Sequence, residues 1–262
     1  NIPLIMDNTA SPIICKPFEH GAAIVVHSLT KYIGGHGTVI GGVLIDGGNF
    51  DWTADPKRQP LFNEPDPSYG GAVWGKVVPE LTGANVAYAV RSRVVLLRDL
   101  GSCLSPDNAF GIIQGLETVA LRMKQHCLNA EKVVNFLSSH KNVDKVIYPT
   151  LYKGELANRA KKYFKEGNGS LIGIEVNGGV KAGKKFIEAL QMFYHVANIG
   201  DARSLAIHPA TTTHSQLTPE ELIAAGVTPG YVRLSIGIEH PDDIIADLSQ
   251  ALEASGKTNL KA

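Results

Sequence analysis

The sequence HSLTKYIGGHG, residues 27–37, follows directly on the apolar run Ala22–Val26. A short apolar run bounded by glycine predicts a buried strand of a parallel sheet that is covered on both faces. Open α/β sheets build their active sites at the carboxyl ends of such strands. Lys31 comes just after the predicted strand, and it is therefore a candidate catalytic residue.

Two short hydroxyl side chains, Ser28 and Thr30, lie just before this lysine. They suit a phosphate ester whose aldehyde is bonded to the same lysine. Gly34 and Gly35, which follow, let the backbone approach a ligand without a Cβ clash. The tetrapeptide alone is a weak signal, and a surface lysine after a strand stays open as an alternative.

The S-x-x-K pattern at Ser28–Lys31 also occurs in penicillin-binding proteins and serine β-lactamases. That interpretation requires a helix that opens at the serine, together with S-D-N and K-T-G motifs elsewhere. Neither companion motif is present, and Ser28 follows a predicted strand. The sequence therefore disfavours this alternative.

Asp7 ends a second predicted strand, Pro3–Met6, and Asn8 and Thr9 follow it. An aspartate at a strand's carboxyl end can point into the same crevice as Lys31. There its carboxylate can keep a pyridine nitrogen protonated through a charge-assisted hydrogen bond. An aspartate that caps a turn or a helix is the alternative.

Arg233 lies in the predicted strand 232–236, where Val232, Leu234 and Ile236 share one face. Because side chains alternate along a strand, Arg233 lies on the opposite face. A guanidinium on a rigid strand offers a planar fork for a carboxylate. The alternative is an arginine in a structural salt bridge.

The rest of the sequence predicts two α/β units joined by a long helix. Residues 42–45 and 170–176 read as further strands, and residues 49–75 as a long irregular excursion. Ser105 and Pro106 are typical of a helix start, and Pro241 opens a final helix. The expected inward stripe of the long helix consists of Ala120, Met123, Cys127, Ala130, Val134 and Leu137.

Composition excludes several classes of function. Lysine plus arginine and aspartate plus glutamate both total 25, so no net field attracts nucleic acid or anionic lipid. The apolar runs are too short to cross a bilayer. Three cysteines without C-x-x-C spacing argue against a disulfide framework or a zinc site and favour a reducing cytoplasm. The spacing of His208 and His214 fits no standard metal-ligand pair, so we expect no metal.

Several of these motifs together resemble the Cys/Met metabolism family of pyridoxal-phosphate (PLP) enzymes, which have fold type I. The family shows Asp-Asn-Thr at a strand end, then Ser-x-Thr-Lys-Tyr, and then Arg-Leu-Ser-x-Gly-x-Glu. The sequence has these motifs in this order at residues 7–9, 28–32 and 233–239, and a further family signature at residues 115–118 and 121–123. The resemblance covers essentially the whole chain.

The resemblance implies a role for each candidate residue. Lys31 would be the Schiff-base lysine that binds PLP covalently, and Asp7 would pair with the pyridine nitrogen. Ser28 and Thr30 would hold the phosphate, and Arg233, helped by Asn198, would bind the substrate carboxylate.

The resemblance also implies an architecture. Residues 1–104 would be part of the large, parallel-rich, three-layered cofactor-binding domain, and residues 105–262 would form the linking helix and a smaller C-terminal α/β domain. A homo-oligomer, expected to be a homotetramer, is implied as well.

Within the family, three stretches resemble the O-acetylhomoserine sulfhydrylases: residues 31–42, 64–69 and 197–205. The implied reaction is γ-replacement of acetate by sulfide or methanethiol, which gives homocysteine or methionine. The alternatives are a methionine or cystathionine γ-lyase or a γ-synthase, in which the position of Asn198 is more often serine. From another class, a catalytically silent structural fragment stays open.

The family's N-terminal half has no counterpart in this sequence. In the family that half supplies a tyrosine that stacks on the cofactor ring and a Tyr-x-Arg phosphate contact. The sequence begins Asn-Ile-Pro, without an initiator methionine, and runs directly into a buried-looking strand, whereas a domain normally opens with a frayed or polar end. We therefore expect the natural chain to be longer.

Overall fold

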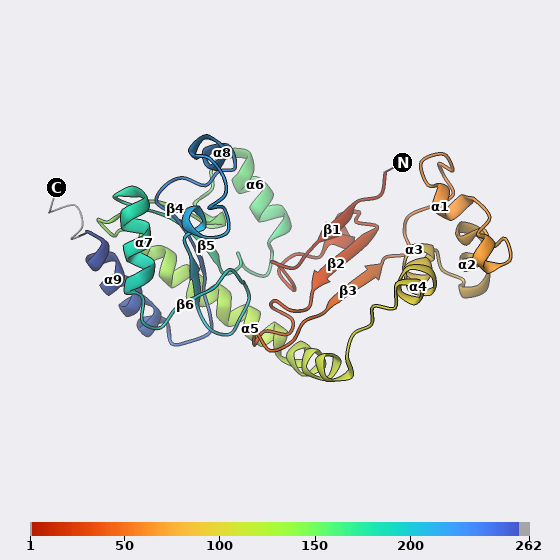
Figure 1. Ribbon diagram of the computed structural model, residues 1–262, viewed down its shortest axis with the longest axis horizontal. Helices are drawn as coiled ribbons and strands as arrows, with labels where there is room; N and C mark the ends of the chain where they lie inside the picture. The colour runs from red at the N-terminus through yellow and green to blue at the C-terminus, as the bar shows by residue number, and fades with distance from the viewer. Residues whose placement is uncertain (1, 257–262) are drawn as a thin grey trace. The chain divides into compact units, whose positions relative to one another are not determined.

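The computed structural model describes residues 2–256, which form two compact units (Figure 1). The first unit comprises the residues up to Thr9, Lys16–Leu29 and Val39–Ile112. The second comprises Ala10–Cys15, Thr30–Thr38 and the residues from Ile113 onward. The chain therefore passes from the first unit to the second between Leu29 and Thr30, next to Lys31. The domain boundary at residues 104 and 105 remains a prediction.

The first unit contains a mixed three-stranded sheet in the order β1-β2-β3. β1 (Ile5–Asp7) runs parallel to β2 (Ile24–Ser28), with Asp7 opposite Val26. β3 (Gly42–Asp46) runs antiparallel to β2. All three predicted strands are confirmed, and the carboxyl ends of β1 and β2 lie at the same edge of the sheet.

The predicted burial of the first strand is wrong for the described chain. Leu4, Ile5 and Met6 are 48%, 46% and 39% exposed, whereas Ala23, Ile24 and Val25 are buried as expected. The reason is position: β2 lies between two strands, and β1 lies at the edge of the sheet with one neighbour.

Residues 49–75, expected to be irregular, contribute much of the first unit's core. The indole of Trp52 lies 4.6 Å from the ring of Phe62 and 5.3 Å from the ring of Tyr88, measured between centroids. Trp74 is buried in the same cluster. The helical segments of this unit are α1 (Pro60–Asn63), η2 (Pro67–Tyr69), α2 (Trp74–Thr82), α3 (Ala87–Arg91), η3 (Ser92–Leu97), α4 (Arg98–Leu100) and, before β2, η1 (Pro17–His20).

α5 (Pro106–Ser138) begins in the first unit and continues into the second. The Ser105 hydroxyl accepts a hydrogen bond from the backbone N–H of Asn108, so the predicted helix start is confirmed. The predicted stripe is buried except at Ala120, where the neighbouring Val119 faces inward instead. The buried side of the helix also carries three polar side chains, Arg122, His126 and Asn129.

The second unit is built on a five-stranded, mostly antiparallel sheet in the order β4-β5-β8-β7-β6. Buried apolar side chains from its central strands form one core with the C-terminal half of α5, with α7 (Gly179–Ala189) and with α9 (Pro241–Gly256). Helices α7 and α9 lie beside the sheet in Figure 1. The elements that follow α5 are β4 (Val143–Ile147), η4 (Pro149–Leu151), α6 (Gly154–Tyr163), β5 (Leu171–Val176), α7 (Gly179–Ala189), β6 (Tyr194–His195), β7 (Leu205–Ile207), η5 (Pro209–Thr211), α8 (Pro219–Ala224), β8 (Tyr231–Ser235) and α9 (Pro241–Gly256).

Within residues 2–256, no helix combines the length and the apolar character that a membrane span needs.

Asp247 of α9 fixes the loop that leads from α7 to β6. Its buried carboxylate accepts hydrogen bonds from the backbone N–H groups of Gln191, Met192 and Phe193 at 2.9, 2.9 and 3.2 Å. The Gln250 amide donates a fourth hydrogen bond at 2.9 Å. One side chain therefore satisfies three backbone donors that have no strand partner at this turn.

Asp247→Ala should lower the free energy of unfolding by about 2–4 kcal/mol, because it leaves several buried donors without an acceptor. Urea unfolding followed by circular dichroism measures this change. Asp243→Ala is the matched control, because Asp243 is exposed in the first turn of the same helix. Its removal should cost less than about 1 kcal/mol, and equal losses in the two variants would contradict the assignment.

Candidate active site

Asp7 lies at the carboxyl end of β1 as an exposed and negatively charged group. Hydrogen bonds from the Thr9 side chain and backbone N–H hold the pKa of Asp7 below its ordinary value. Among residues 2–256, no lysine or arginine forms an ion pair with it. Asp7 also caps a turn, which was the alternative expected from the sequence: the Thr9 N–H donates a hydrogen bond to Asp7 Oδ1 at 2.9 Å. This hydrogen bond leaves the negative charge of Asp7 available for a ligand.

Thr9 ties the end of β1 to the end of β2. Its hydroxyl accepts a hydrogen bond from the Ser28 backbone N–H at 2.7 Å, and Asn8 N–H donates to Val26 O at 2.9 Å. Asp7 and Ser28 therefore lie at one edge of one sheet, as expected from the sequence.

Lys31, Asn198 and Arg233 form a hydrogen-bonded cluster within the second unit. The Lys31 ammonium donates to the side-chain oxygen of Asn198. An Arg233 Nη2–H donates to the backbone oxygen of the same residue at 3.3 Å. One asparagine thus contacts the predicted Schiff-base lysine and the predicted carboxylate-binding arginine.

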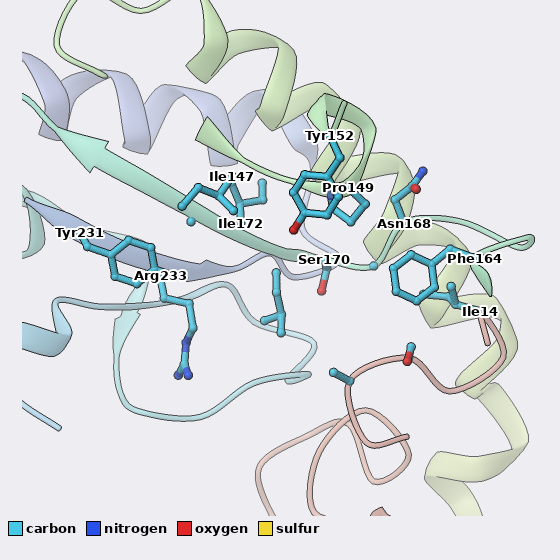
Figure 2. Close-up of a pocket in the computed structure, with 15 residues that line it drawn as sticks. Ile14, Ile147, Pro149, Tyr152, Phe164, Asn168, Ser170, Ile172, Tyr231 and Arg233 are labelled. Carbon is cyan, nitrogen blue, oxygen red and sulfur yellow. The ribbon is translucent and has the colours of Figure 1, made fainter. Parts of the chain in front are cut away.

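Arg233 projects from β8 beside a pocket of about 440 Å³ (Figure 2). No carboxylate among the described residues forms a salt bridge with it, so the structural salt bridge considered as an alternative is not present there. The pocket walls are largely apolar and include Ile14, Tyr152, Phe164 and Tyr231. The Arg233 guanidinium is therefore a cation that has no counter-ion among residues 2–256. It lies at the edge of a mainly apolar pocket, which suits a carboxylate ligand.

Tyr32, the residue after Lys31, anchors residues 31–35, the lysine segment, in the second unit. Tyr32 is fully buried, and its hydroxyl lies 2.7 Å from Ser170 Oγ. Burial raises the pKa of Tyr32 to about 12. The His126 ring packs edge-on against it, with centroids 5.4 Å apart. The backbone oxygen of Gly35 accepts a further hydrogen bond from Ala202 N–H at 2.8 Å.

Two alternatives drawn from the sequence find no support. Ser28 ends strand β2 and a turn follows it, so no helix opens at this serine as a β-lactamase motif requires. The second alternative is a metal site at His208 and His214. Both ring nitrogens of His208 already have partners within the protein, Thr211 Oγ1 and the Pro229 oxygen, each at 2.9 Å.

Arg122 and His126 were assigned no role from the sequence, although both lie near the lysine segment. His126 is fully buried, with Nδ1 2.7 Å from the backbone oxygen of Ile236 and Nε2 without a hydrogen-bond partner. Burial lowers the pKa of His126 to about 4. The available signal was position, since both residues interrupt the apolar stripe of a long helix.

The chain is similar to known proteins over almost its whole length. The profile of the Cys/Met metabolism PLP-dependent enzymes matches residues 1–253. The chain belongs to this family.

Two similar members of the family are named for the synthesis of homocysteine or for the sulfhydrylation of O-acetylhomoserine. The O-acetyl-L-homoserine sulfhydrylase of Leptospira meyeri is 53% identical over 96% of the chain and 58% of its own length. The homocysteine synthase of Schizosaccharomyces pombe is 47% identical over 97% of the chain and 58% of its own length. The chain therefore spans little more than half the length of these relatives.

A solved structure has a matching fold. A Campylobacter jejuni protein assigned as an O-acetylhomoserine (thiol)-lyase superimposes with a TM-score of 0.87 and 44% identity. The match covers 96% of the chain and 59% of the other protein, whose structure contains a pyridoxyl-lysine phosphate. The predicted fold class, a C-terminal part of a fold type I PLP enzyme, is confirmed.

The residues of this family member fit the family's cofactor. Lys31 has a primary amine, the type of group that binds an aldehyde covalently, and Ser28 and Thr30 have hydroxyl groups, which can donate hydrogen bonds to a phosphate. Asp7 supplies an exposed carboxylate whose pKa is lowered and which has no lysine or arginine partner in the described chain. Such a group is suited to a protonated ring nitrogen.

The buried His126 should make stability depend on pH. The unfolded chain binds a proton at this histidine below about pH 6.5, whereas the folded chain binds it only near pH 4. The contribution of His126 is therefore fully present above pH 6.5 and is lost as the pH falls toward 4. Between pH 7 and pH 5 the wild-type protein should lose about 2 kcal/mol through this group.

Urea unfolding of the wild type and of His126→Gln at both pH values measures this loss. The variant should lose less stability than the wild type over the same pH interval. An equally steep loss would show that His126 titrates in the folded protein as it does in the unfolded chain.

Proposed function

We propose that the full-length protein is a PLP-dependent O-acetylhomoserine sulfhydrylase, which replaces the acetate of O-acetylhomoserine with sulfide or methanethiol. The products would be homocysteine or methionine, together with acetate. The observation that carries the proposal is the cluster in which Asn198 contacts both Lys31 and Arg233. It brings a primary amine and a carboxylate-binding cation together, as an enzyme that acts on an amino acid requires.

Lys31 and Arg233 have complementary tasks in this proposal. The guanidinium of Arg233 binds the substrate carboxylate through two parallel hydrogen bonds. The Lys31 amine binds the cofactor aldehyde covalently and, once displaced by the substrate, accepts and returns protons at the substrate's carbon atoms. Asn198 orients both groups, because its side chain contacts the lysine and its backbone contacts the arginine.

Asp7, Ser28 and Thr30 hold the cofactor in the proposal. When bound, PLP supplies an electron sink for the negative charge that develops on the substrate. Asp7 keeps the ring nitrogen protonated, and Ser28 and Thr30 donate hydrogen bonds to the phosphate.

The choice of O-acetylhomoserine as the substrate rests on the names of similar proteins. Proteins named for O-acetylhomoserine sulfhydrylation or homocysteine synthesis are 53% and 47% identical to the chain. Asn198, where γ-lyases more often have serine, agrees with this choice. We also propose a homotetramer in a reducing cytoplasm, with which the lack of disulfides among Cys15, Cys103 and Cys127 is compatible.

The purified full-length protein should form homocysteine from O-acetylhomoserine and sulfide faster than it acts on O-succinylhomoserine or methionine. Lys31→Ala should lower turnover by several orders of magnitude, because no other group of the cluster can bind the aldehyde. Steady-state kinetics with the three substrates, and absorbance of the lysine–cofactor linkage, measure both effects.

Borohydride reduction followed by peptide mapping identifies the lysine directly. Lys76→Ala, which removes an exposed lysine of α2, is the matched control and should retain activity. Label on a peptide that lacks Lys31 would overturn the assignment. A preference for methionine or cystathionine would instead favour a γ-lyase.

Arg233→Ala should lower kcat/KM by roughly 30-fold to several-thousand-fold, since loss of one partner of a desolvated charge pair costs about 2–5 kcal/mol. Arg233→Lys should recover only part of this loss, because an ammonium group cannot make the two-pronged contact. Cofactor absorbance should survive in both variants. Normal kinetics with a lowered melting temperature would show that Arg233 has a structural role only.

A further inference from the structure

Arg122 is a buried cation that forms no ion pair with any acidic residue of the described chain. Its side chain lies on the inward stripe of α5, and the residue is 6% exposed. No carboxylate in the described part of the chain forms a salt bridge with it. Burial lowers the pKa of the Arg122 guanidinium from its ordinary value. A buried charge is costly unless hydrogen bonds compensate it, so its hydrogen-bond partners indicate what it does.

Those partners are three backbone oxygens, two in the lysine segment and one in its own helix, and one side-chain hydroxyl of that helix. Nη1–H donates to the oxygen of Tyr32 at 2.6 Å, and Nη2–H donates to the oxygen of Ile33 at 3.0 Å. Nη2–H also donates to Gly115 O at 2.7 Å, and Nε–H donates to Thr118 Oγ1 at 3.2 Å. The helix thus fixes the plane of the guanidinium, and the guanidinium holds the two carbonyls that directly follow Lys31.

The surrounding backbone is shaped for this contact. Gly35 has a φ of +73°, and a Cβ added at this position would collide with the Arg122 guanidinium. A Cβ at Gly115 would collide with the oxygens of Ile33 and Gly34. Both glycines allow the lysine segment to lie flat against α5 over the arginine.

A rigid backbone after Lys31 matters for the proposed chemistry. A reacting group must be held close to its productive position, and a displacement of about 1 Å can lower the rate by about a hundredfold. Tyr32 and Ile33 are buried, so their carbonyls cannot use water as a donor. Arg122 donates to both of these oxygens.

We propose that Arg122 is a positioning residue for Lys31, which holds the backbone of the lysine segment rigid by bridging the carbonyls of Tyr32 and Ile33. The inference rests on the proposed function for the role of Lys31 as the Schiff-base residue. Arg122 contacts neither substrate nor cofactor in this proposal and acts through the two carbonyls alone.

Arg122→Lys and Arg122→Met test this role in the full-length protein prepared with PLP. Lysine keeps the charge and the stem but cannot bridge two carbonyls with a planar fork. Lys124→Met, which removes an exposed cation from the same helix, is the matched control. The first readout is hydrogen–deuterium exchange of the peptide that contains Gly35, whose N–H donates to Lys31 O at 2.7 Å.

Exchange in this peptide should become at least about tenfold faster in Arg122→Lys, and faster still in Arg122→Met. The kcat of Arg122→Lys should fall about a hundredfold while KM changes less than about threefold. Lys124→Met should match the wild type in both measurements. Unchanged exchange and kcat in a folded Arg122→Lys would overturn the proposal, as would a lower melting temperature with no change in either.

Failure of the proposed function gives a different result. If borohydride labels another lysine in the wild type, Lys31 is not the Schiff-base residue, whatever the variants show. If Lys31 is labelled but exchange and kcat do not respond to Arg122→Lys, only the positioning role fails.

Discussion

The burial of Tyr32 is the constraint on which the position of Lys31 depends. The tyrosine ring lies in the core of the second unit, with its hydroxyl against Ser170 and its edge near His126. Consecutive Cα atoms are 3.8 Å apart, so a residue next to a fully buried anchor has little freedom. Lys31 therefore belongs to the second unit, although it follows directly on a strand of the first. Asn198 and Arg233 meet the lysine there because they belong to the same unit.

The proposed machinery divides between the units according to its task. Asp7 and Ser28 belong to the first unit, where the ends of two parallel strands hold them at one edge. The amine, the amide and the guanidinium belong to the second. Asp7 and Ser28 thus share one sheet, and Lys31, Asn198 and Arg233 share one hydrogen-bonded cluster.

Features with local causes could be predicted from the sequence. The strands before Asp7 and Ser28, the capped start of α5 and the strand that carries Arg233 all follow from short patterns. The burial of β1 could not be predicted, because it depends on what covers an edge strand. The contact between Lys31 and Asn198 joins residues far apart in sequence, and Asn198 entered only through the family resemblance. Arg122 could be recognised from the sequence as a charged residue on an apolar helical stripe, which needs a buried partner. Its partners, mainly backbone oxygens, could not be read from the sequence.

The hydrogen bonds around Lys31 span long stretches of chain. Arg122 lies 90 residues beyond Tyr32, Ser170 lies 138 residues beyond it, and Asn198 lies 167 residues beyond Lys31. Closing such loops costs entropy before the contacts form, and contacts of this kind slow folding. The pairing of β1 with β2, whose partners are about twenty residues apart, is local by comparison. On a growing chain the lysine's own strand can pair early, whereas the lysine acquires its neighbours only after Asn198 and Arg233 have been synthesised.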